Sequence, residues 1–357
     1  MKNVFLVNTP LQLLNAIEAK YHFKLDAEDC LLIVMGDRKS QPQLLSLAGS
    51  VDKEFGCVTV LNNVRLFPGD PFAVSGSLLG RMFADIKILK KSIFNIRRLN
   101  KIANYLEEVD YIFIGYVRLI YTRHFVNTLI HKKVFLLDDG TATLALAKER
   151  KQGFFIDPEK NLKAKLKFYG KRLISRVKDE YQESYSFFTM YDIDPGGKDQ
   201  VIKNEFTYMR AKIDLLPDSD DVYFIGSPLS EAGFISQDEF LENIERIKAY
   251  FKNRRILYIA HRRESKNKLD ILSKKYGLKV VMFDYPIEYQ LSHVGSRPEL
   301  LASFVSSALD SCRIIFGDKM KIISFKLDLN ENHKQLLQVY DNYATYIDDN
   351  FIVETNY

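Results

Sequence analysis

Short runs of apolar residues recur along the chain, separated by segments in which apolar residues return every three or four positions. A run of about four to seven apolar residues is too short for a helix and is typical of a buried strand. The longer period predicts amphipathic helices, as at residues 11–21 and 237–253. Strands that alternate with helices indicate a parallel sheet covered on both faces. The expected strands are residues 4–7, 30–35, 57–61, 111–115, 134–137, 185–190, 222–226, 255–260, 279–283, 300–305 and 321–327.

This alternation is interrupted near the middle of the chain. Residues 217–221 are acidic and rich in turn-forming residues, as a linker between domains would be. A second series of strands and helices follows them. A length of 357 residues is ample for two domains. We therefore expect two α/β domains, residues 1–216 and 217–357, each with its own sheet and facing each other across a cleft.

The stretch from Val134 to Gly140 carries the strongest chemical signal. Four apolar residues run directly into Asp138, Asp139 and Gly140. Ligands of open α/β sheets bind at the carboxyl ends of the strands, where these two acids are expected. Repulsion between the two carboxylates, and desolvation by the apolar residues beside them, would raise the pKa of at least one carboxyl group. Such a group is a candidate general base. The alternative is an ordinary turn with Asp138 as a cap and Asp139 in solvent.

A second candidate site lies at the start of the first helix. Thr9 is placed to cap this helix, Pro10 would occupy its first position, and Gln12 would complete a capping box. A helix N-terminus directly after a strand can hold an anion or a substrate hydroxyl. Thr9 and Gln12 are therefore candidate acceptor-binding residues; the alternative is a plain capped core helix.

Further polar residues follow expected strands in the second half of the chain. They are Ser227, His261, Glu288, Ser306 and Ser307. A two-domain enzyme with a ligand cleft requires polar residues at strand ends. The structural alternatives are a histidine satisfied by backbone, a solvated loop glutamate and a pair of helix-capping serines.

Several classes of site have no motif in this sequence. There is no G-x-G-x-x-G or Walker motif, which argues against dinucleotide oxidoreductases and P-loop NTPases, and no H-E-x-x-H. Asp218-Ser219-Asp220 spells D-x-D, but it lies in the linker-like stretch, so we expect no metal site there. Cys30, Cys57 and Cys312 are too few and too scattered for a disulfide framework or a zinc site.

Composition and charge bear on the cellular location of the protein. A hydrophobic content of 46% and a charged content of 27% are typical of a globular protein. We find neither a signal peptide nor a run of roughly 18 apolar residues, and expect a cytoplasmic protein. The net charge of +5 is concentrated in residues 87–101 and 160–178. These segments could lie on an anionic inner membrane or form ordinary surface helices.

Four short motifs together resemble a known family. LLDDG, FIGSPLSE, YIAHRRES and SFVSSAL stand in this order. They resemble the bacterial sialyltransferases, most closely the lipooligosaccharide sialyltransferases of glycosyltransferase family 52. The resemblance runs from about residue 4 to about residue 330. It implies the GT-B fold, in which two Rossmann-like domains face each other across a central cleft.

The resemblance also implies roles for individual residues. Asp139 would be the general base that takes a proton from the acceptor hydroxyl, and Asp138 would tune or position it. His261 would bind the donor phosphate and help cytidine monophosphate to leave, although Arg262 follows it where more distant relatives have proline. The other implied donor ligands are Ser306 and Ser307 for the phosphate, Glu288 for the ribose, and Gly226, Ser227 and Pro228 for the cytosine.

The resulting prediction is an inverting sialyltransferase that needs neither a metal ion nor a cofactor. Its donor would be CMP-sialic acid and its acceptor a terminal galactoside of a lipooligosaccharide or capsule-type glycan. The alternatives are a glycosyltransferase of the same fold with another sugar nucleotide, and a non-catalytic nucleotide- or sugar-binding protein. A homodimer is a further expectation; a nucleic acid partner is not, because the charge is modest and no binding motif is present.

Overall fold

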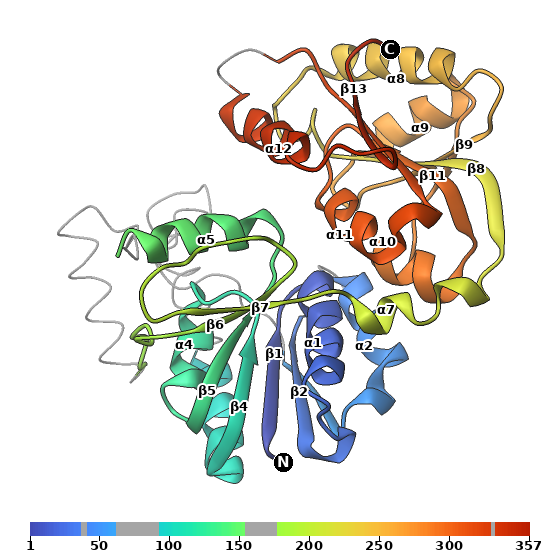
Figure 1. The fold of residues 1–357 in the computed structure, drawn as a ribbon. Coiled ribbons are helices and arrows are strands. Elements are labelled where there is room, and N and C mark those ends of the chain that lie inside the picture. Colours follow the sequence, from blue (N-terminus) through green and yellow to red (C-terminus); the bar gives the residue numbers. More distant parts are fainter. Residues whose placement is uncertain (37–40, 62–92, 154–176, 330–332) are drawn as a thin grey trace, which may run out of the picture. The chain divides into compact units, whose positions relative to one another are not determined.

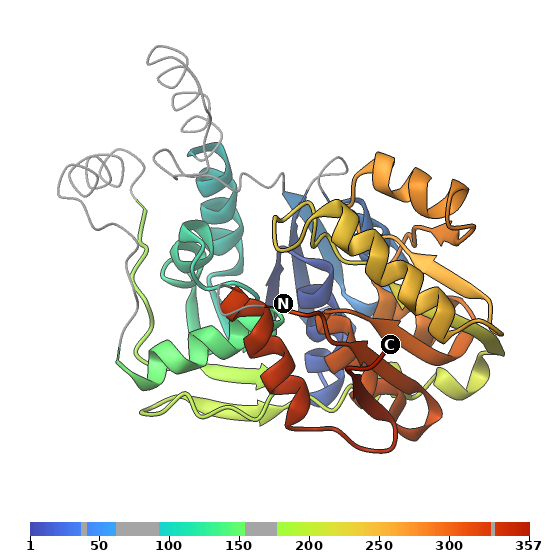
Figure 2. The same ribbon diagram turned by 90° about the horizontal axis from the view of Figure 1, so that it is seen from above.

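The computed structural model describes residues 1–36, 41–61, 93–153, 177–329 and 333–357 (Figures 1 and 2). The chain divides into two compact units, Met1–Asn204 and Glu205–Tyr357, here called unit 1 and unit 2. Each unit contains its own parallel sheet. The expected fold class, two α/β domains, is therefore confirmed.

Unit 1 contains the strands β1 (Asn3–Val7), β2 (Cys30–Met35), β3 (Cys57–Leu61), β4 (Glu108–Ile114), β5 (Ile130–Leu137), β6 (Ser186–Thr189) and β7 (Gln200–Lys203). They form one sheet in the order β3-β2-β1-β4-β5-β6-β7 (Figure 1). All neighbours are parallel, and Leu6 of β1 is paired with Ile114 of β4. The strands therefore end along one edge of the sheet.

The described helices of unit 1 are α1 (Pro10–His22), α2 (Pro42–Ser50), residues 93–106, α4 (Ile120–Val126) and α5 (Thr141–Lys151), with 3₁₀ turns η1 (Ala27–Asp29) and η2 (Asp52–Glu54). α1 begins as predicted, because Thr9 Oγ1 accepts a hydrogen bond from Gln12 N at 3.2 Å. The predicted capping box is wrong. Gln12 Oε1 accepts from Asn8 N at 2.7 Å, one residue before the cap.

One face of the unit 1 sheet is packed with phenylalanine rings. Phe5, Phe113 and Phe135 stack across β1, β4 and β5, with ring centroids 4.4 and 4.7 Å apart. Phe23, directly after α1, lies 4.8 Å from the ring of Phe135. Buried aromatic pairs contribute about 0.5–1.5 kcal/mol beyond the area they bury. This stack holds α1 on the sheet and so fixes where the N-terminus of α1 lies.

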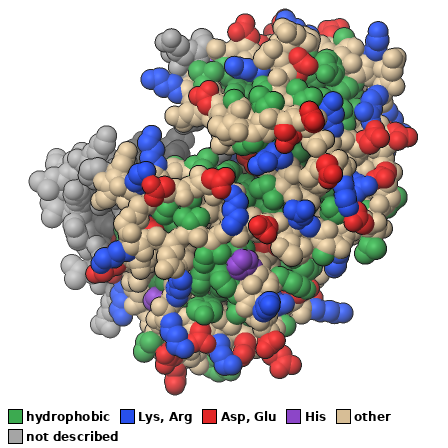
Figure 3. All heavy atoms as spheres, viewed as in Figure 1, with side chains coloured by type: hydrophobic (Ala, Val, Ile, Leu, Met, Phe, Trp, Pro, Cys, Tyr) green, Lys and Arg blue, Asp and Glu red, His purple; other side chains and the backbone are tan. Residues whose placement is uncertain are grey.

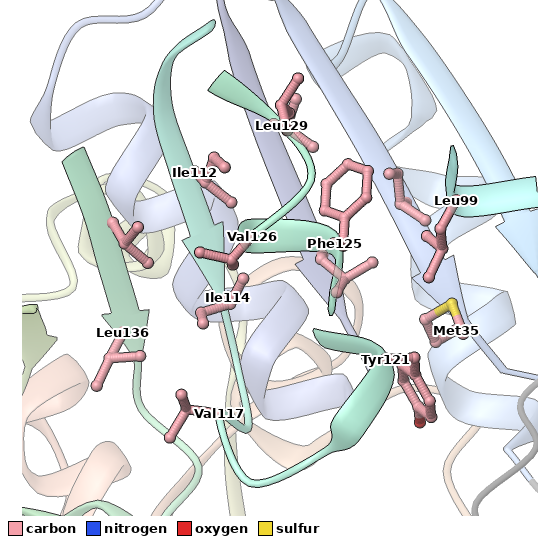
Figure 4. Close-up of a cluster of buried hydrophobic side chains, with 14 of the residues drawn as sticks. Met35, Leu99, Ile112, Ile114, Val117, Tyr121, Phe125, Val126, Leu129 and Leu136 are labelled. Atoms are coloured by element: carbon pink, nitrogen blue, oxygen red, sulfur yellow. The ribbon is translucent and has the colours of Figure 1, made fainter. Parts of the chain in front are cut away.

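The opposite face of the same sheet carries an aliphatic core (Figure 4). Ile114 of β4 and Leu136 of β5 belong to it, and α4 contributes Phe125. Leu99 reaches the same cluster from the helix at residues 93–106. Full burial of one such side chain stabilises a fold by about 1.5–3 kcal/mol. The alternation of Phe135 and Leu136 on opposite faces shows that β5 is covered on both sides.

Unit 2 contains the strands β8 (Asp218–Ile225), β9 (Ile256–Ile259), β10 (Lys279–Val281), β11 (Arg297–Ser303), β12 (Lys321–Phe325) and β13 (Phe351–Glu354). They form a parallel sheet in the order β10-β9-β8-β11-β12-β13. β8 and β11 lie at its centre, where Ser303 is paired with Ile225.

The described helices of unit 2 are α7 (Thr207–Arg210), α8 (Gln237–Tyr250), α9 (Lys266–Lys274), α10 (Ile287–Tyr289), α11 (Ser307–Phe316) and α12 (Lys334–Ala344), with the 3₁₀ turns η3 (Ile213–Leu215) and η5 (Gly317–Lys319) and a π-helical turn η4 (Gln290–Val294). α8 starts with a full capping box between Ser236 and Glu239. It buries Phe240, Ile244 and Ile247, the apolar stripe predicted for this segment.

The prediction of a linker at residues 217–221 is wrong. β8 begins at Asp218, so these residues belong to a strand and not to a loop, and the side chains of Asp218 and Asp221 are paired with arginines. Asp218 Oδ1 accepts from Arg297 Nε at 2.9 Å, and both carboxylate oxygens of Asp221 accept from Arg255. The division between the units falls between Asn204 and Glu205, earlier than the boundary expected after residue 216.

Candidate active site

The two aspartates after β5 have different surroundings, although they are adjacent in the chain. Asp138 is fully buried. Its Oδ1 accepts a hydrogen bond from Thr189 Oγ1 at 2.6 Å, and its Oδ2 accepts from Met190 N at 2.7 Å. Burial raises the pKa of Asp138 to about 6, although Thr189, Met190 and Thr143 oppose the rise. Asp138 therefore fastens the end of β5 to the end of β6; its expected tuning of Asp139 stays a prediction.

Asp139 is only partly buried and lies at the N-terminus of α1. Its Oδ1 accepts from Thr9 Oγ1 at 3.3 Å, and its backbone N–H donates to Thr143 Oγ1 at 3.0 Å. Burial raises the pKa of Asp139, and the Gln12 amide and the Thr9 hydroxyl oppose this rise. A positioned carboxylate with a raised pKa can accept a proton from a substrate hydroxyl.

Thr9 and Gln12, the expected acceptor-binding residues, lie near Asp139. Gln12 is fully buried, and its Nε2 makes no hydrogen bond to any described residue. A Cβ atom at Gly115 would lie 2.0 Å from the Gln12 side chain, so only glycine leaves room for this side chain beside β4. The Gln12 amide is thereby held near Asp139. Whether it contacts an acceptor stays a prediction.

Asn15 belongs to this site and was not predicted. It is fully buried; its Nδ2 donates to Asp138 O at 3.2 Å, and its Oδ1 accepts from Asn204 Nδ2 at 2.8 Å. It therefore holds the backbone of the D-D-G turn from α1. The pattern of α1 places Asn15 outside its apolar stripe, which is why it gave no signal. Its position one turn after Thr9 and Gln12 was the available clue.

Tyr116 lies near Asp139, and Arg118 lies near Tyr116. β4 and β5 end together, with Ile114 paired with Leu136, so the loop after β4 starts next to the D-D-G turn. Burial raises the pKa of the Tyr116 hydroxyl; nearby Arg118 opposes this rise, and Asp139 reinforces it. Arg118 Nη2 donates to Glu149 Oε1 of α5 at 2.5 Å. This part of unit 1 thus combines the Asp139 carboxyl group, the Tyr116 phenol and the Arg118 guanidinium group.

In unit 2, His261 follows β9 and is held in one orientation. Its backbone N–H donates to Glu264 Oε2 at 2.6 Å, and its ring Nδ1 accepts from Arg263 N at 3.1 Å. Nδ1 is therefore the unprotonated ring nitrogen, and Nε2 carries the proton. Burial, with the cations of Arg262, Arg263 and Lys268, lowers the pKa of His261 to about 4. At neutral pH His261 can donate one hydrogen bond from Nε2.

Gly226, Ser227 and Pro228 follow β8, the neighbour of β9. A Cβ atom at Gly226 would lie 2.4 Å from Glu264 Oε2. Only glycine therefore allows the two loops to approach this closely. Ser227 Oγ is buried and makes no hydrogen bond to any described residue.

Ser306 and Ser307 lie at the start of α11, as predicted. Ser306 caps the helix: its Oγ accepts from Ala308 N at 3.3 Å. Tyr343 Oη accepts from Ser306 N at 3.1 Å and donates to Ser306 O at 2.8 Å. Ser307 is exposed at the first position of the helix. The N-terminus of an α-helix is a suitable place for a phosphate.

Glu288 belongs to α10, which packs against α11, and its side chain is buried. Its Oε1 accepts from Ser311 Oγ at 2.7 Å, and burial raises the pKa of its carboxyl group. This hydrogen bond joins α10 to α11. The solvated-loop alternative is wrong, whereas a contact with ribose stays a prediction.

In the described part of the chain, no cluster of three His, Cys, Asp or Glu side chains could hold a metal ion. None of the helices in this part is long and apolar enough to cross a membrane.

The sequence was next compared with known families. A profile of the alpha-2,8-polysialyltransferase (POLYST) family matches residues 3–324. This chain belongs to the alpha-2,8-polysialyltransferase family. The sialyltransferase character and the glycosyltransferase activity class predicted from the four motifs are confirmed at family level, whereas the match does not point to the lipooligosaccharide family. No curated protein gives a significant sequence match.

Solved structures agree on the fold. UGT73P12 of Glycyrrhiza uralensis, complexed with glycyrrhetinic acid 3-O-monoglucuronide, is similar with a TM-score of 0.50 and 10% identity, over 99% of this chain and 81% of that chain. The UDP-GlcNAc 2-epimerase of Methanocaldococcus jannaschii has a TM-score of 0.47 and 14% identity, over 99% of this chain and 89% of that chain. Its two parallel sheets and its likeness to UGT73P12 agree with the predicted GT-B fold.

Proposed function

We propose that this chain transfers sialic acid from CMP-sialic acid to a glycan hydroxyl, with inversion and without a metal ion or cofactor. The observation that carries the proposal is the family match over residues 3–324. A sialyl donor leaves as a nucleoside monophosphate, so only one phosphate has to be stabilised. Positioning, one base and hydrogen bonds to that phosphate then suffice for catalysis.

Asp139 is the proposed general base. The acceptor oxygen bonds to the anomeric carbon of sialic acid while the bond from that carbon to the phosphate oxygen breaks. Asp139 takes the hydroxyl proton, and the electron pair of the broken bond leaves with cytidine monophosphate. A single displacement of this kind inverts the anomeric centre. The raised pKa of Asp139 and its partial exposure support this role.

The donor is assigned to unit 2. His261 would donate from Nε2 to the phosphate, and Ser306 and Ser307 would offer hydroxyl and backbone donors at the start of α11. A bound phosphate would also raise the low pKa of His261, because a nearby negative charge favours the imidazolium form. Gly226, Ser227 and Pro228 would line the cytosine, and Glu288 the ribose.

Two acceptors are proposed. The first is the terminal galactoside of a lipooligosaccharide or capsule-type glycan. The second is a sialoside, because the family name describes α-2,8 sialyl transfer. Arg118 favours the second: its guanidinium is partly exposed near Tyr116, which in turn lies near Asp139, and its only hydrogen bond among the described residues goes to Glu149. The remaining donors suit the carboxylate of an acceptor sialic acid.

The partners proposed beyond substrates are a membrane and a second copy of the chain. The exposed side of the helix at residues 93–106 carries Phe94, Arg97, Lys101 and Tyr105, a composition that suits an anionic lipid surface. Residues 87–92 and 160–176 of the basic segments lie outside the described residues. Salt-dependent binding to anionic vesicles would test the membrane contact, and sedimentation would test a homodimer.

Product formation separates these proposals from their alternatives. The chain would be incubated with CMP-sialic acid and either lactose or sialyllactose, with and without EDTA. We expect sialylated product in both EDTA conditions, and Asp139→Asn as the inactive control. Transfer from a UDP-sugar instead would favour another donor, and CMP binding without any transfer would favour a non-catalytic binder. Loss of turnover on chelation that Mg²⁺ restores would contradict the metal-free mechanism.

A further inference from the structure

A lysine is completely buried behind the proposed donor site. Lys268 of α9 has no exposed surface. Its Nζ lies 2.9 Å from Glu264 Oε1 and 2.9 Å from Glu231 Oε2, and 4.1 Å from the ring centre of Phe240. A buried ammonium group is costly unless it is paired and hydrogen-bonded. This one is surrounded by two carboxylates and the face of an aromatic ring.

Both carboxylates hold the loop that carries His261. Glu264 Oε2 accepts from His261 N at 2.6 Å, while Glu264 Oε1 accepts from Tyr258 Oη at 2.6 Å. Glu231 Oε1 accepts from Ser265 N at 2.8 Å. The loop between β9 and α9 is therefore fixed at both ends by acids that Lys268 neutralises.

Lys268 also reaches the loop after β8. Its Nζ lies 3.4 Å from Ser227 O and 3.4 Å from Ser230 Oγ. Gly226 lies against Glu264, since a Cβ atom there would be 2.4 Å from Glu264 Oε2. One side chain thus joins the two loops to which cytosine and phosphate are assigned.

We propose that Lys268 is the positioning residue of the donor site, which holds His261 with Nε2–H available and keeps Gly226 and Ser227 in place for the nucleotide. This inference rests on the proposed function, because it assigns the donor to these loops. The contacts of Lys268 are all within unit 2, so the proposal needs no contribution from unit 1.

The charges around His261 give a signature that packing alone would not produce. Burial is the largest cause of the low pKa of His261; Arg262, Arg263 and Lys268 lower this pKa further, and Glu231 raises it. Loss of Lys268 would remove a positive charge and leave two carboxylates uncompensated. The pKa of His261 should then rise from about 4 toward the ordinary value of about 6.5.

The test compares Lys268→Met with Arg255→Met in the full chain. Arg255 is also paired with an acid, Asp221, but its side chain is 68% exposed. The His261 ring would be titrated by NMR, and CMP affinity measured by calorimetry. For Lys268→Met we expect a higher pKa of His261 and at least a tenfold weaker CMP affinity. For Arg255→Met we expect both quantities to stay at the parent values.

A second variant covers the case in which Lys268→Met does not fold. Lys268→Met combined with Glu231→Gln removes one charge of each sign, and the glutamine oxygen can still accept from Ser265 N. We expect this variant to fold and still to bind CMP at least tenfold more weakly than the parent. Parent-like CMP affinity in the folded variant would overturn the proposal.

The two hypotheses fail in different ways. If the parent binds no CMP, the proposed function fails. The pKa of His261 in the parent and in Lys268→Met still tests whether Lys268 influences this ring. If the parent binds CMP and Lys268→Met leaves both the His261 titration and the affinity unchanged, the positioning role is wrong and the proposed function stands.

Discussion

Asp138 and Asp139 show how two identical neighbours take separate roles. Both oxygens of Asp138 are used by Thr189 and Met190, and the side chain is sealed from solvent. Asp139 shares only one oxygen with Thr9 and keeps part of its surface accessible. Asp139 is therefore accessible from solvent, and Asp138 is not. The local pattern after the strand does not distinguish the two acids; the family resemblance assigned the base to Asp139, and the contacts of β6 and α1 give the two side chains different surroundings.

Replacing Asp139 should affect the chemical step alone. Asp139→Asn keeps an oxygen for the Thr9 hydroxyl but removes the proton acceptor. A general base is worth about 10²–10⁴-fold in rate, so kcat should fall by roughly that factor. CMP affinity should stay at the parent value, because a base acts in the transition state. Steady-state kinetics and CMP calorimetry on both proteins measure this; near-normal turnover would show that Asp139 is not the base.

Asp138 should make the stability of the chain depend on pH. Its pKa is raised to about 6 in the folded state, above about 3.9 in an unfolded chain. The folded state therefore binds this proton more tightly. This contribution to the free energy of unfolding is fully present below about pH 4 and is lost as the pH rises through 6, on the order of 3 kcal/mol in all.

Asp138→Asn cannot ionise, so its free energy of unfolding, measured in urea between pH 4 and 7, should lack this slope with pH. Asp192→Asn, a change at an exposed acid of unit 1, should keep the slope; parallel curves for Asp138→Asn and the parent would contradict the assignment.

At the scale of helices and strands, the sequence predicted the central strands well. β1, β2 and β4 each contain a continuous apolar run (VFLV, CLLIVM and YIFI) because both faces of the sheet are covered there, and this pattern is easy to detect. The edge strands β7 and β13 were missed, since QVIK and FIVE are short and partly polar. α5 was also missed, although its sequence TATLALAKERK is rich in strong helix formers.

The sequence offered as candidates the residues that follow strands and missed those that depend on packing. Asp139, His261 and Ser306 follow strands, and this position can be read from the chain. Asn15 and Lys268 act from inside helices, facing away from solvent into buried polar networks. Nothing in the local pattern separates such residues from ordinary helix surface, because their partners come from distant segments.

Tyr343 should support the phosphate site from α12. Its hydroxyl makes both of its hydrogen bonds to the backbone of Ser306. Tyr343→Phe keeps the packing but leaves Ser306 N without this acceptor, while Ser306 O keeps its hydrogen bond from Leu309 N at 3.0 Å. We expect a loss of about 1–3 kcal/mol in the free energy of unfolding and a higher KM for the donor. Tyr340→Phe is the matched control, because the Tyr340 hydroxyl bonds to Phe325 O and Leu327 N at the end of β12. The control should lose similar stability with an unchanged donor KM; equal KM values for both variants would contradict the role of Tyr343.

For the whole molecule, the order of the motifs was more informative than any one of them. Each motif is common by itself: D-D-G, the histidine at a strand end, and the paired serines. Their order along two α/β units predicted a sialyltransferase-like GT-B protein. Charge gave less information: Figure 3 shows basic and acidic side chains interspersed over the face it presents, which accords with a net charge of only +5. The hydrogen bonds that hold Asp139 lie within unit 1, and those that hold His261 lie within unit 2. Donor and acceptor functions can therefore be tested separately.

Nucleotide stabilisation of the intact chain provides such a test. A ligand that binds only the folded state at 100 times its Kd stabilises that state by about 2.7 kcal/mol. For units of this size, this corresponds to a rise in Tm of roughly 5–10 °C. We expect CMP to produce this rise with or without EDTA. CDP and UDP should produce much less, since the proposed site offers His261, Ser306 and Ser307 to a single phosphate.

Two variants separate the two units. Asp139→Asn should show the same rise in Tm with CMP as the parent. His261→Gln should lose most of this rise, because a charge-assisted hydrogen bond to phosphate is worth about 1.5–3 kcal/mol. A larger shift with UDP than with CMP would assign unit 2 to a different sugar nucleotide, and a CMP shift that survives in His261→Gln would place the phosphate elsewhere.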